Sequence, residues 1–599
     1  MLARKGIWIV IVLLLALVAC NNGNVANDAA TPAAVVEAPQ PAATEEPAAA
    51  PTAAAPTAAP PVAPTAAPAA DTESAAMEAE PVTLHIGWPE KPDTLNPAMA
   101  QLSSSNILFG LVYDTMYELA LDGSTSPGLV ESVNVSPDGL VWTFTIGAGF
   151  MFHDGQPLTA ADVAFTYNLT RDHAEFWTSQ YVTFFESVTA PDDRTVVIAL
   201  TEVIPNLESQ LAWIRILPEH VWSQLGEGEA AEFDNAAMIG SGPFRLVEYV
   251  GGERVRLAAV GSHPLATPQT DEIVFHTFEN TEEMVEALRA GQVDLITEVP
   301  AAAMDALRAD ADIELAIGQP LLPSVADIIL NQMAPENCPP DDGICSGHPA
   351  LADRNVRLAL AHATDKQGLV ETILGGQGTP GRTLIPEGLG IWFNNNLVDY
   401  PFDIARANEI LETAGYLDQD GDGIRETPDG LPLAFRIYWP DDTPTTPLLA
   451  EALAESWGQI GIAFSAMEEL DFDNLLGACC PSFDFDIILW TWSTAADPDF
   501  MLMVMTSDEI PTGWNETGYA NPEYDALYAR QARTLDQEER IAIVHQMQQI
   551  VFDDIVYIIP YSPLAVQAYR SDRFSGWLTN EVKVALETRN SLVVVSPAR

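Results

Sequence analysis

One acidic segment has the spacing of a cation-binding loop. Residues 418–429 read DQDGDGIRETPD, with oxygen ligands available at loop positions one, three, five, nine and twelve and a main-chain carbonyl at seven. Such oxygens surround a hard cation such as Ca²⁺, and the glycine at position six permits the sharp turn. Because the last acid is the shorter aspartate and the segment that follows does not predict a second helix, an acidic turn without metal remains the alternative. The candidate ligands are Asp418, Asp420, Asp422, Ile424, Glu426 and Asp429.

Four cysteines of the body could form disulfides. Cys338 and Cys345 bracket the turn-rich segment PPDDGI, so a local disulfide is expected outside the cell. Cys479 and Cys480 are adjacent, and three states stay open for them: a bond between neighbours, two buried thiols, or pairing with the first two cysteines. A zinc site is disfavoured because CxxC spacing is missing.

The fifth cysteine, Cys20, ends a segment typical of export signals. Arg4 and Lys5 precede an apolar run from Ile7 to Val18, and a small residue stands before the cysteine. The run is too short to span a bilayer, which needs about 20 apolar residues, although a membrane anchor is the alternative. Because the pattern resembles a bacterial lipobox, residues 1–20 are expected to be a lipoprotein signal peptide with lipid attached at Cys20.

Composition separates a linker from a globular body. Residues 21–80 are rich in Ala, Pro and Thr with scattered acids, and they predict a disordered tether. The roughly 520 residues that follow exceed one hydrophobic core and suit two or three lobes. A formal charge of −59 excludes a nucleic-acid reader, because such proteins need basic surface to neutralise phosphates.

Local patterns in the body predict an α/β protein. Residues 82–88 alternate like a strand, and residues 106–119 read as a helix. Asp138-Gly139 between alternating apolar residues predicts a hairpin. Thr159 is expected to cap a helix that starts at Ala160.

A series of motifs resembles one family along nearly the whole body, from about residue 82 to 580. In chain order the motifs are FHDGQPLTAADV at 152–163, GSGPFRL at 240–246, LRAGQVD at 288–294, NVRLALA at 355–361, ANEIL at 407–411, WGQIGI at 457–462, DPD at 497–499 and YDAL at 524–527. They resemble the family 5 extracytoplasmic solute-binding proteins of peptide, opine and nickel ABC importers, which include dipeptide- and oligopeptide-binding proteins. His153, inside the first motif, is interpreted as a hydrogen-bonded turn residue.

The resemblance implies a periplasmic-binding-protein type II fold, which is α/β, with three lobes and a hinged ligand cleft between lobes I and III. Closure around a solute would produce the form that docks on a permease. The expected lobes are lobe I at 82–118, 240–330 and 556–599, lobe II at 119–239, and lobe III at 331–555.

The resemblance also implies where the ligand binds. In peptide-binding relatives the strand before the Asp-Pro motif lines the pocket, and an aspartate about four residues before the proline pairs with the peptide amine. Thr494 stands at that position here, with Asp497 the nearest acid, and the loop after Tyr438 has no base. Aromatic faces suit peptide side chains or sugar rings, whereas burial in the core is the alternative for each tryptophan. The predicted ligand-binding residues are Trp490, Trp492, Thr494, Asp497, Tyr438 and Trp439.

No catalytic motif accompanies this family pattern. HExxH and GxSxG are missing from the sequence, and the glycine-rich run at 376–381 follows no predicted strand. We therefore expect a non-enzymatic, monomeric, lipid-anchored receptor that takes up a solute, foremost oligopeptides, for an ABC permease and requires no cofactor. An oligosaccharide receptor of the same class, or a surface sensor or lectin without a permease, is the alternative.

Overall fold

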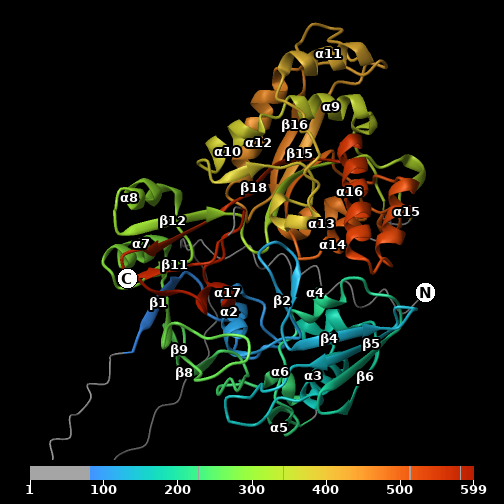
Figure 1. Cartoon of the computed structure of the whole chain (residues 1–599). Coiled ribbons are helices and arrows are strands. Elements are labelled where there is room, and N and C mark those ends of the chain that lie inside the picture. The colour runs from blue at the N-terminus through green and yellow to red at the C-terminus, as the bar shows by residue number, and fades with distance from the viewer. Residues whose placement is uncertain (1–80, 227, 341–342, 511–513, 580–581, 599) are drawn as a thin grey trace, which may run out of the picture. The chain divides into compact units, whose positions relative to one another are not determined.

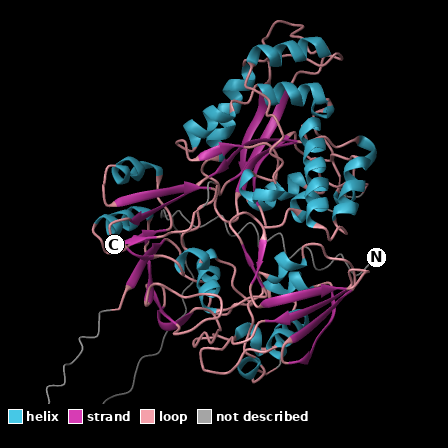
Figure 2. Ribbon diagram, in the orientation of Figure 1, coloured by secondary structure: helices cyan, strands magenta, loops and turns pink. Residues whose placement is uncertain are grey.

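The computed structural model describes residues 81–226, 228–340, 343–510, 514–579 and 582–598. The predicted signal peptide, the predicted lipid-attachment residue Cys20 and the predicted tether at 21–80 lie outside the described residues. The described chain forms a mixed α/β structure (Figures 1 and 2).

A seven-stranded sheet contains the predicted strand at 82–88, which is β1. Its strand order is β12-β19-β11-β1-β10-β9-β8, and β1 runs parallel to both of its neighbours. Leu84 and Ile86 of β1 are fully buried against helix α2 and the strands beside it. The strands are β1 Thr83–Trp88, β8 Phe244–Val250, β9 Arg254–Ala259, β10 Glu272–Thr277, β11 Leu295–Ile296, β12 Ile313–Gly318 and β19 Ala565–Arg570.

A four-stranded antiparallel sheet carries the predicted Asp-Gly hairpin. The order is β4-β5-β7-β6, and Val135 of β4 pairs with Trp142 of β5 around the turn at Gly139, whose φ is 74°. Trp142 and Phe144 alternate inward as the pattern indicates. The strands are β4 Val130–Val135, β5 Val141–Ile146, β6 Phe185–Asp192 and β7 Thr195–Leu200.

A six-stranded sheet has the order β14-β18-β13-β17-β15-β16. The face with Ile328 packs in one core and the face with Ile329 in another, so the strands are buried on both sides. The sheet includes β13 and β18, which the lobe boundaries at 330 and 556 had assigned to lobe I. Both strands pair with β17 or β14 instead of with the seven-stranded sheet. The strands are β13 Ser324–Leu330, β14 Gly378–Pro380, β15 Ala434–Pro440, β16 Ala463–Leu470, β17 Ile487–Ser493 and β18 Tyr557–Pro563.

Two chain segments connect the six-stranded and seven-stranded sheets. Residues 319–323 join β12 to β13, and Leu564 joins β18 to β19. Side chains tie the crossings together: Gln319 Nε2 donates to Thr379 Oγ1 at 3.0 Å, and Ser562 Oγ donates to Gln319 Oε1 at 3.1 Å. This paired crossing is the geometry that a hinge requires.

The predicted helix at Ala160 has its expected cap, whereas the helix predicted at 106–119 ends early. Thr159 forms a capping box with Asp162 at the start of α3. The helix predicted at 106–119 ends at Val112, because Tyr113 is extended and Asp114 is buried in an ion pair with Arg589 at 2.8 Å. The helices are α2 Ser103–Val112, α3 Ala160–Asp172, α4 Leu207–Leu211, α5 Glu219–Trp222, α6 Glu229–Glu232, α7 Thr281–Arg289, α8 Met304–Arg308, α9 Arg354–His362, α10 Lys366–Ile373, α11 Ile404–Ala414, α12 Thr446–Gly458, α13 Phe472–Cys479, α14 Asp499–Met503, α15 Pro522–Gln531, α16 Gln537–Asp554 and α17 Arg589–Leu592.

Short elements complete the chain. The 3₁₀ turns are η2 Trp177–Val182, η3 Ala301–Ala303, η4 Pro335–Asn337, η5 Pro349–Ala352, η6 Glu387–Trp392 and η7 Ser507–Glu509. The two small antiparallel pairs are β2 Tyr117–Leu119 with β3 Thr125–Pro127, and β20 Phe574–Ser575 with β21 Ser596–Pro597.

Two of the sequence motifs dock on each other. The backbone N–H of His153 donates to the carbonyl of Gly240 at 2.8 Å, and its Nε2 lies 3.0 Å from the carbonyl of Gly242. A Cβ at Gly240 would lie 1.9 Å from the carbonyl oxygen of Val112, so only glycine permits this approach. His153 is therefore a hydrogen-bonded turn residue, as predicted.

Candidate functional site: an acidic pocket and an aromatic surface

An acidic pocket of about 340 Å³ lies where the two sheets are connected. Its wall is built from the end of β1, the start of α2, the segment after β11, the turn before β14 and the crossing from β18 to β19. The lining residues are Trp88, Pro89, Glu90, Ser103, Ser104, Ile107, Thr297, Glu298, Val299, Gln377, Leu564, Ala565, Val566 and Glu587.

Three glutamates give this pocket its charge. Desolvation raises the pKa of each of Glu90, Glu298 and Glu587, with weaker opposing hydrogen bonds at the first and third. Gln567 Nε2 donates to Glu587 at 2.6 Å, whereas Glu298 accepts no hydrogen bond within the described chain. Because no lysine or arginine is among the described lining residues, the pocket suits a cationic group.

Sequence reasoning missed these three glutamates. Glu90 follows a strand, Glu298 follows a two-residue strand, and Glu587 lies near the C-terminus, so nearly 500 residues separate the first from the last. The turn after β1 was the single local signal, because a polar loop at the end of a buried strand is a common place for binding residues.

Trp490 and Trp492 project from one face of β17, as their spacing predicts. Both are half-buried, and they pair across the strand with Asp327 and Val325 of β13. We call the group formed by Trp490, Trp492 and the rings beside them the aromatic surface. Its other rings are Phe472, 5.9 Å from Trp490, and Phe500 and Trp514, 5.8 and 6.4 Å from Trp492. None of these residues lines the acidic pocket.

Tyr438 and Trp439 lie on opposite faces of β15. Tyr438 packs beside the aromatic surface, in the same core as Trp490. Trp439 belongs to the core on the other face, is 8% exposed, and donates from Nε1 to Glu469 at 3.3 Å. Trp439 is therefore buried in the core, which was the alternative for each tryptophan, and it lies away from Trp490.

Thr494 and Asp497, the two polar residues predicted to contact the ligand, both bond to other groups of the protein. Thr494 is buried, and both its N–H and its hydroxyl donate to the carbonyl of Pro323, at 3.0 and 2.6 Å. Both carboxylate oxygens of Asp497 accept from Arg540, at 2.5 and 2.7 Å. Neither residue offers a free group to a ligand amine in this arrangement.

Two buried acids behind the aromatic surface were also missed. Glu516 accepts at Oε1 from Trp492 Nε1 at 2.8 Å and from the Tyr557 hydroxyl at 3.2 Å. Asp327 is fully buried, and neither of its oxygens has a hydrogen-bond partner in the described part of the chain. An aspartate inside the apolar strand SVADIIL was the available signal.

The acidic loop gathers four of the predicted calcium ligands. Ligand oxygens of Asp418, Asp420, Asp422 and Glu426 lie within 4.8 Å of one another, and Asp429 is outside this group. The backbone N–H groups of Gly421 and Gly423 already donate to Asp418, at 2.7 and 3.1 Å. Structural calcium stays a prediction.

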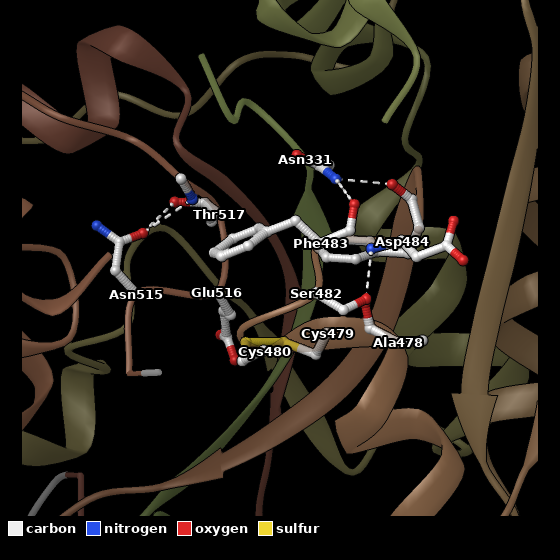
Figure 3. The surroundings of a disulfide bond; sticks show 12 residues. Asn331, Ala478, Cys479, Cys480, Ser482, Phe483, Asp484, Asn515, Glu516 and Thr517 are labelled. Carbon is white, nitrogen blue, oxygen red and sulfur yellow. Dashed lines mark hydrogen bonds between the residues drawn. A yellow bond between two sulfur atoms is a disulfide. The ribbon is translucent and has the colours of Figure 1, made fainter. Parts of the chain in front are cut away.

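The described cysteines form two local disulfides. Cys338 bonds Cys345, and Cys479 bonds its neighbour Cys480 (Figure 3). Of the three states left open for the second pair, the structure adopts the bond between neighbours. Glu516 is among the residues that surround this bond.

A second cavity of about 370 Å³ lies at the docked motifs. Its two histidines are engaged, the ring of His153 with the carbonyl of Gly242 and the N–H of Gly240, and His263 with buried Asp114 at 3.2 Å. It shares no lining residue with the acidic pocket.

The fold, the paired crossing and the pocket beside it define a solute-binding protein of the periplasmic type. The family model "Bacterial extracellular solute-binding proteins, family 5 Middle" matches residues 124–512. The chain therefore belongs to the family 5 solute-binding proteins of ABC importers, which are extracytoplasmic and are not enzymes.

Individual relatives agree with this assignment. The oligopeptide-binding protein AppA of Bacillus subtilis is 26% identical over 500 residues, covering 82% of this chain and 88% of that protein. The structure of AppA in complex with a nonapeptide matches with a TM-score of 0.61 at 22% identity, covering 87% of this chain and all of that one. HbpA2 from Haemophilus parasuis matches with a TM-score of 0.73 at 22% identity, covering 86% and 100%.

Among the described residues, no helix combines the length and the apolar character needed to cross a bilayer.

Proposed function

We propose that this protein is a lipid-anchored receptor that captures oligopeptides outside the cell and delivers them to the permease of an ABC importer. The acidic pocket carries the peptide part of this proposal, because its described lining presents three glutamates and no lysine or arginine at the junction of the two sheets. A free peptide carries an ammonium group at its first residue, which such a pocket stabilises. The oligopeptide-binding relative from B. subtilis supports the same solute class.

The two crossings between the sheets, residues 319–323 and Leu564, act as the hinge that closes the protein around a solute in the pocket. A solute bound at the crossings contacts residues of both sheets, such as Glu298 beside β11 and Gln377 beside β14. It therefore binds the closed form better than the open form, and this difference in affinity drives closure. The aromatic surface offers flat apolar faces for side chains of the peptide. The lipid at Cys20 and the tether at 21–80 would keep the receptor near its permease.

The test compares a peptide with its N-acetylated form by calorimetry. Acetylation removes the ammonium charge, and a hydrogen bond to a charged group contributes about 1.5–3 kcal/mol, so we expect affinity to fall about tenfold or more. The variant Glu298→Gln should lose most of this preference, since Glu298 has no hydrogen-bond partner among the described residues. Glu286→Gln, on the exposed face of α7, is the matched control and should bind like the parent.

Other outcomes separate the alternatives. Equal affinity for both forms would refute the amine assignment to the pocket. Native mass spectrometry of protein from cells grown in peptide-rich medium should show adducts that fragment into amino-acid residues. Adducts spaced by hexose units would favour an oligosaccharide receptor, and failure to capture membrane subunits of a transporter would favour a sensor or lectin.

A further inference from the structure

Asp327 and Glu516 form a buried acidic pair behind the aromatic surface. On β13, Asp327 lies between Val325, which pairs with Trp492, and Ile329, which pairs with Tyr557, and both of these aromatic residues donate to Glu516. Asp327 is fully buried on β13 with both oxygens unpartnered in the described chain, and Glu516 is 5% exposed. Glu516 accepts hydrogen bonds from Trp492 and Tyr557 at the same oxygen. Neither carboxyl group forms an ion pair within the part of the chain that the structure describes.

Among the described residues, the elements packed around the pair supply no positive charge. The strand β17 presents Trp492, β18 presents Tyr557, and α15 presents Tyr524, which lies next to Tyr557. The disulfide Cys479–Cys480 lies beside Glu516 and does not titrate (Figure 3). Burial raises the pKa of both tyrosines well above 10, so they remain neutral at physiological pH.

Electrostatics then limits the charge of the pair. An isolated buried carboxylate is costly, and two adjacent ones without a cation are costlier still. Burial, followed by the charge of Glu516, raises the pKa of Asp327 well above its usual value, and burial raises that of Glu516 to about 7. Such interacting groups release their protons as a pair.

We propose that Asp327 and Glu516 together retain at least one proton at neutral pH and that this protonated pair positions Trp492 in the aromatic surface. Glu516 is the direct link, because its Oε1 accepts the indole N–H of Trp492 at 2.8 Å. When the proton leaves, repulsion between two buried anions weakens that arrangement. The pair thus makes one wall of the aromatic surface sensitive to pH.

Linkage gives the sign of the accompanying stability change. The folded state keeps a proton that the unfolded state loses near pH 4, so folding binds protons above that pH. The free energy of unfolding therefore decreases as pH rises from about 4 through the pKa values of the folded pair. Neutral amides at these positions should remove this decrease.

The first test detects the proton directly in the full chain by infrared spectroscopy. At neutral pH we expect the parent to show a C=O band of an un-ionised carboxylic acid that is lost in Asp327→Asn. Glu523→Gln, an exposed carboxyl on neighbouring α15, should leave the band unchanged. A parent spectrum that Asp327→Asn does not alter would overturn the proposal.

The second test reads the position of Trp492 without any solute. The difference in fluorescence between the parent and Trp492→Phe should change as the pH rises through the pKa of Glu516, about 7. Glu516→Gln keeps a neutral acceptor for the indole, so its emission should match the neutral parent and stay constant as the pH rises. Glu516→Ala should differ at every pH, and a parent signal that does not vary with pH would contradict the proposal.

A third measurement connects the pair to the solute and rests on the proposed function. Peptide affinity of the parent should weaken as the pH rises through the same pKa, and that of Glu516→Gln should not. If no peptide binds, the proposed function is refuted. The infrared band and the indole fluorescence still test whether Asp327 and Glu516 retain a proton. If Asp327→Asn does not fold, Glu516→Gln and the pH titration of the parent decide it.

Discussion

At the scale of single residues, Asp497 is bound to another part of its own chain. Asp497 is 8% exposed and lies just before α14. It forms a bidentate ion pair with Arg540 of α16, which is 3% exposed. The guanidinium also lies 4.9 Å from the ring centroid of Trp392. Desolvation opposes the charge of Arg540, but the carboxylates of Asp497 and Asp499 outweigh it and raise its pKa. The family motif DPD therefore stabilises the joint between two helices.

We predict that Asp497→Ala lowers the free energy of unfolding by about 3–5 kcal/mol, because it leaves the guanidinium of Arg540 buried without its partner. Urea unfolding measures this loss. The control is Glu409→Ala, which removes an exposed ion pair with Arg406 on α11 and should change stability by less than about 0.5 kcal/mol. A loss below about 1 kcal/mol for Asp497→Ala, together with weaker solute binding, would return Asp497 to the ligand site.

At the scale of elements, the acidic loop between α11 and β15 depends on its own backbone. Glu426 is buried and accepts from the N–H of Gln419 at 2.8 Å, which draws the two ends of the loop together. Asp418, Asp420 and Asp422 stay exposed in the turn. Like charges held this close favour a cation among them.

We predict that calcium stabilises the parent protein by about 2.7 kcal/mol at a concentration one hundred times its Kd. Thermal unfolding with calcium or a chelator measures this. Asp420→Ala should abolish the effect because it removes a ligand oxygen, whereas Asp429→Ala should retain it because Asp429 lies outside the cluster. An unchanged Tm on chelation would leave the loop as an acidic turn.

At the scale of the whole molecule, the proposed binding of a peptide amine in the acidic pocket implies that affinity depends on pH. Desolvation raises the pKa of Glu90, Glu298 and Glu587, so these groups take up protons at a higher pH than ordinary glutamates, which titrate near pH 4.3. A protonated glutamate no longer attracts an ammonium group.

We therefore predict that affinity for a peptide with a free amine falls with decreasing pH, starting above about pH 4.3, whereas affinity for its acetylated form changes less. Calorimetry across this range, with Glu298→Gln alongside, measures the difference. Parallel pH profiles for the two ligands would contradict it. This acid-side loss is separate from the alkaline change expected of the pair Asp327 and Glu516.

The sequence by itself determined the local elements and the family. Three local features were predicted from the sequence: the strand at 82–88, the turn at Gly139 and the helix cap at Thr159. Each depends on residues only a few positions apart, so the sequence pattern alone indicates it. The ordered motifs identified the solute-binding class for a related reason, since each motif is a short stretch of consecutive residues. The spacing of Trp490 and Trp492 likewise placed both on one strand face.

Only the tertiary structure decided which charged groups meet and which strands share a sheet. Strands β13 and β18 belong to the six-stranded sheet. The sequence did not predict this, because strand pairing is a contact between distant segments that local patterns do not encode. The same distance hid the acidic pocket, whose glutamates come from both ends of the body, and the pairing of Asp497 with Arg540. Burial, which sets whether an acid is a free ligand, an ion-pair partner or a proton carrier, arises when these segments pack.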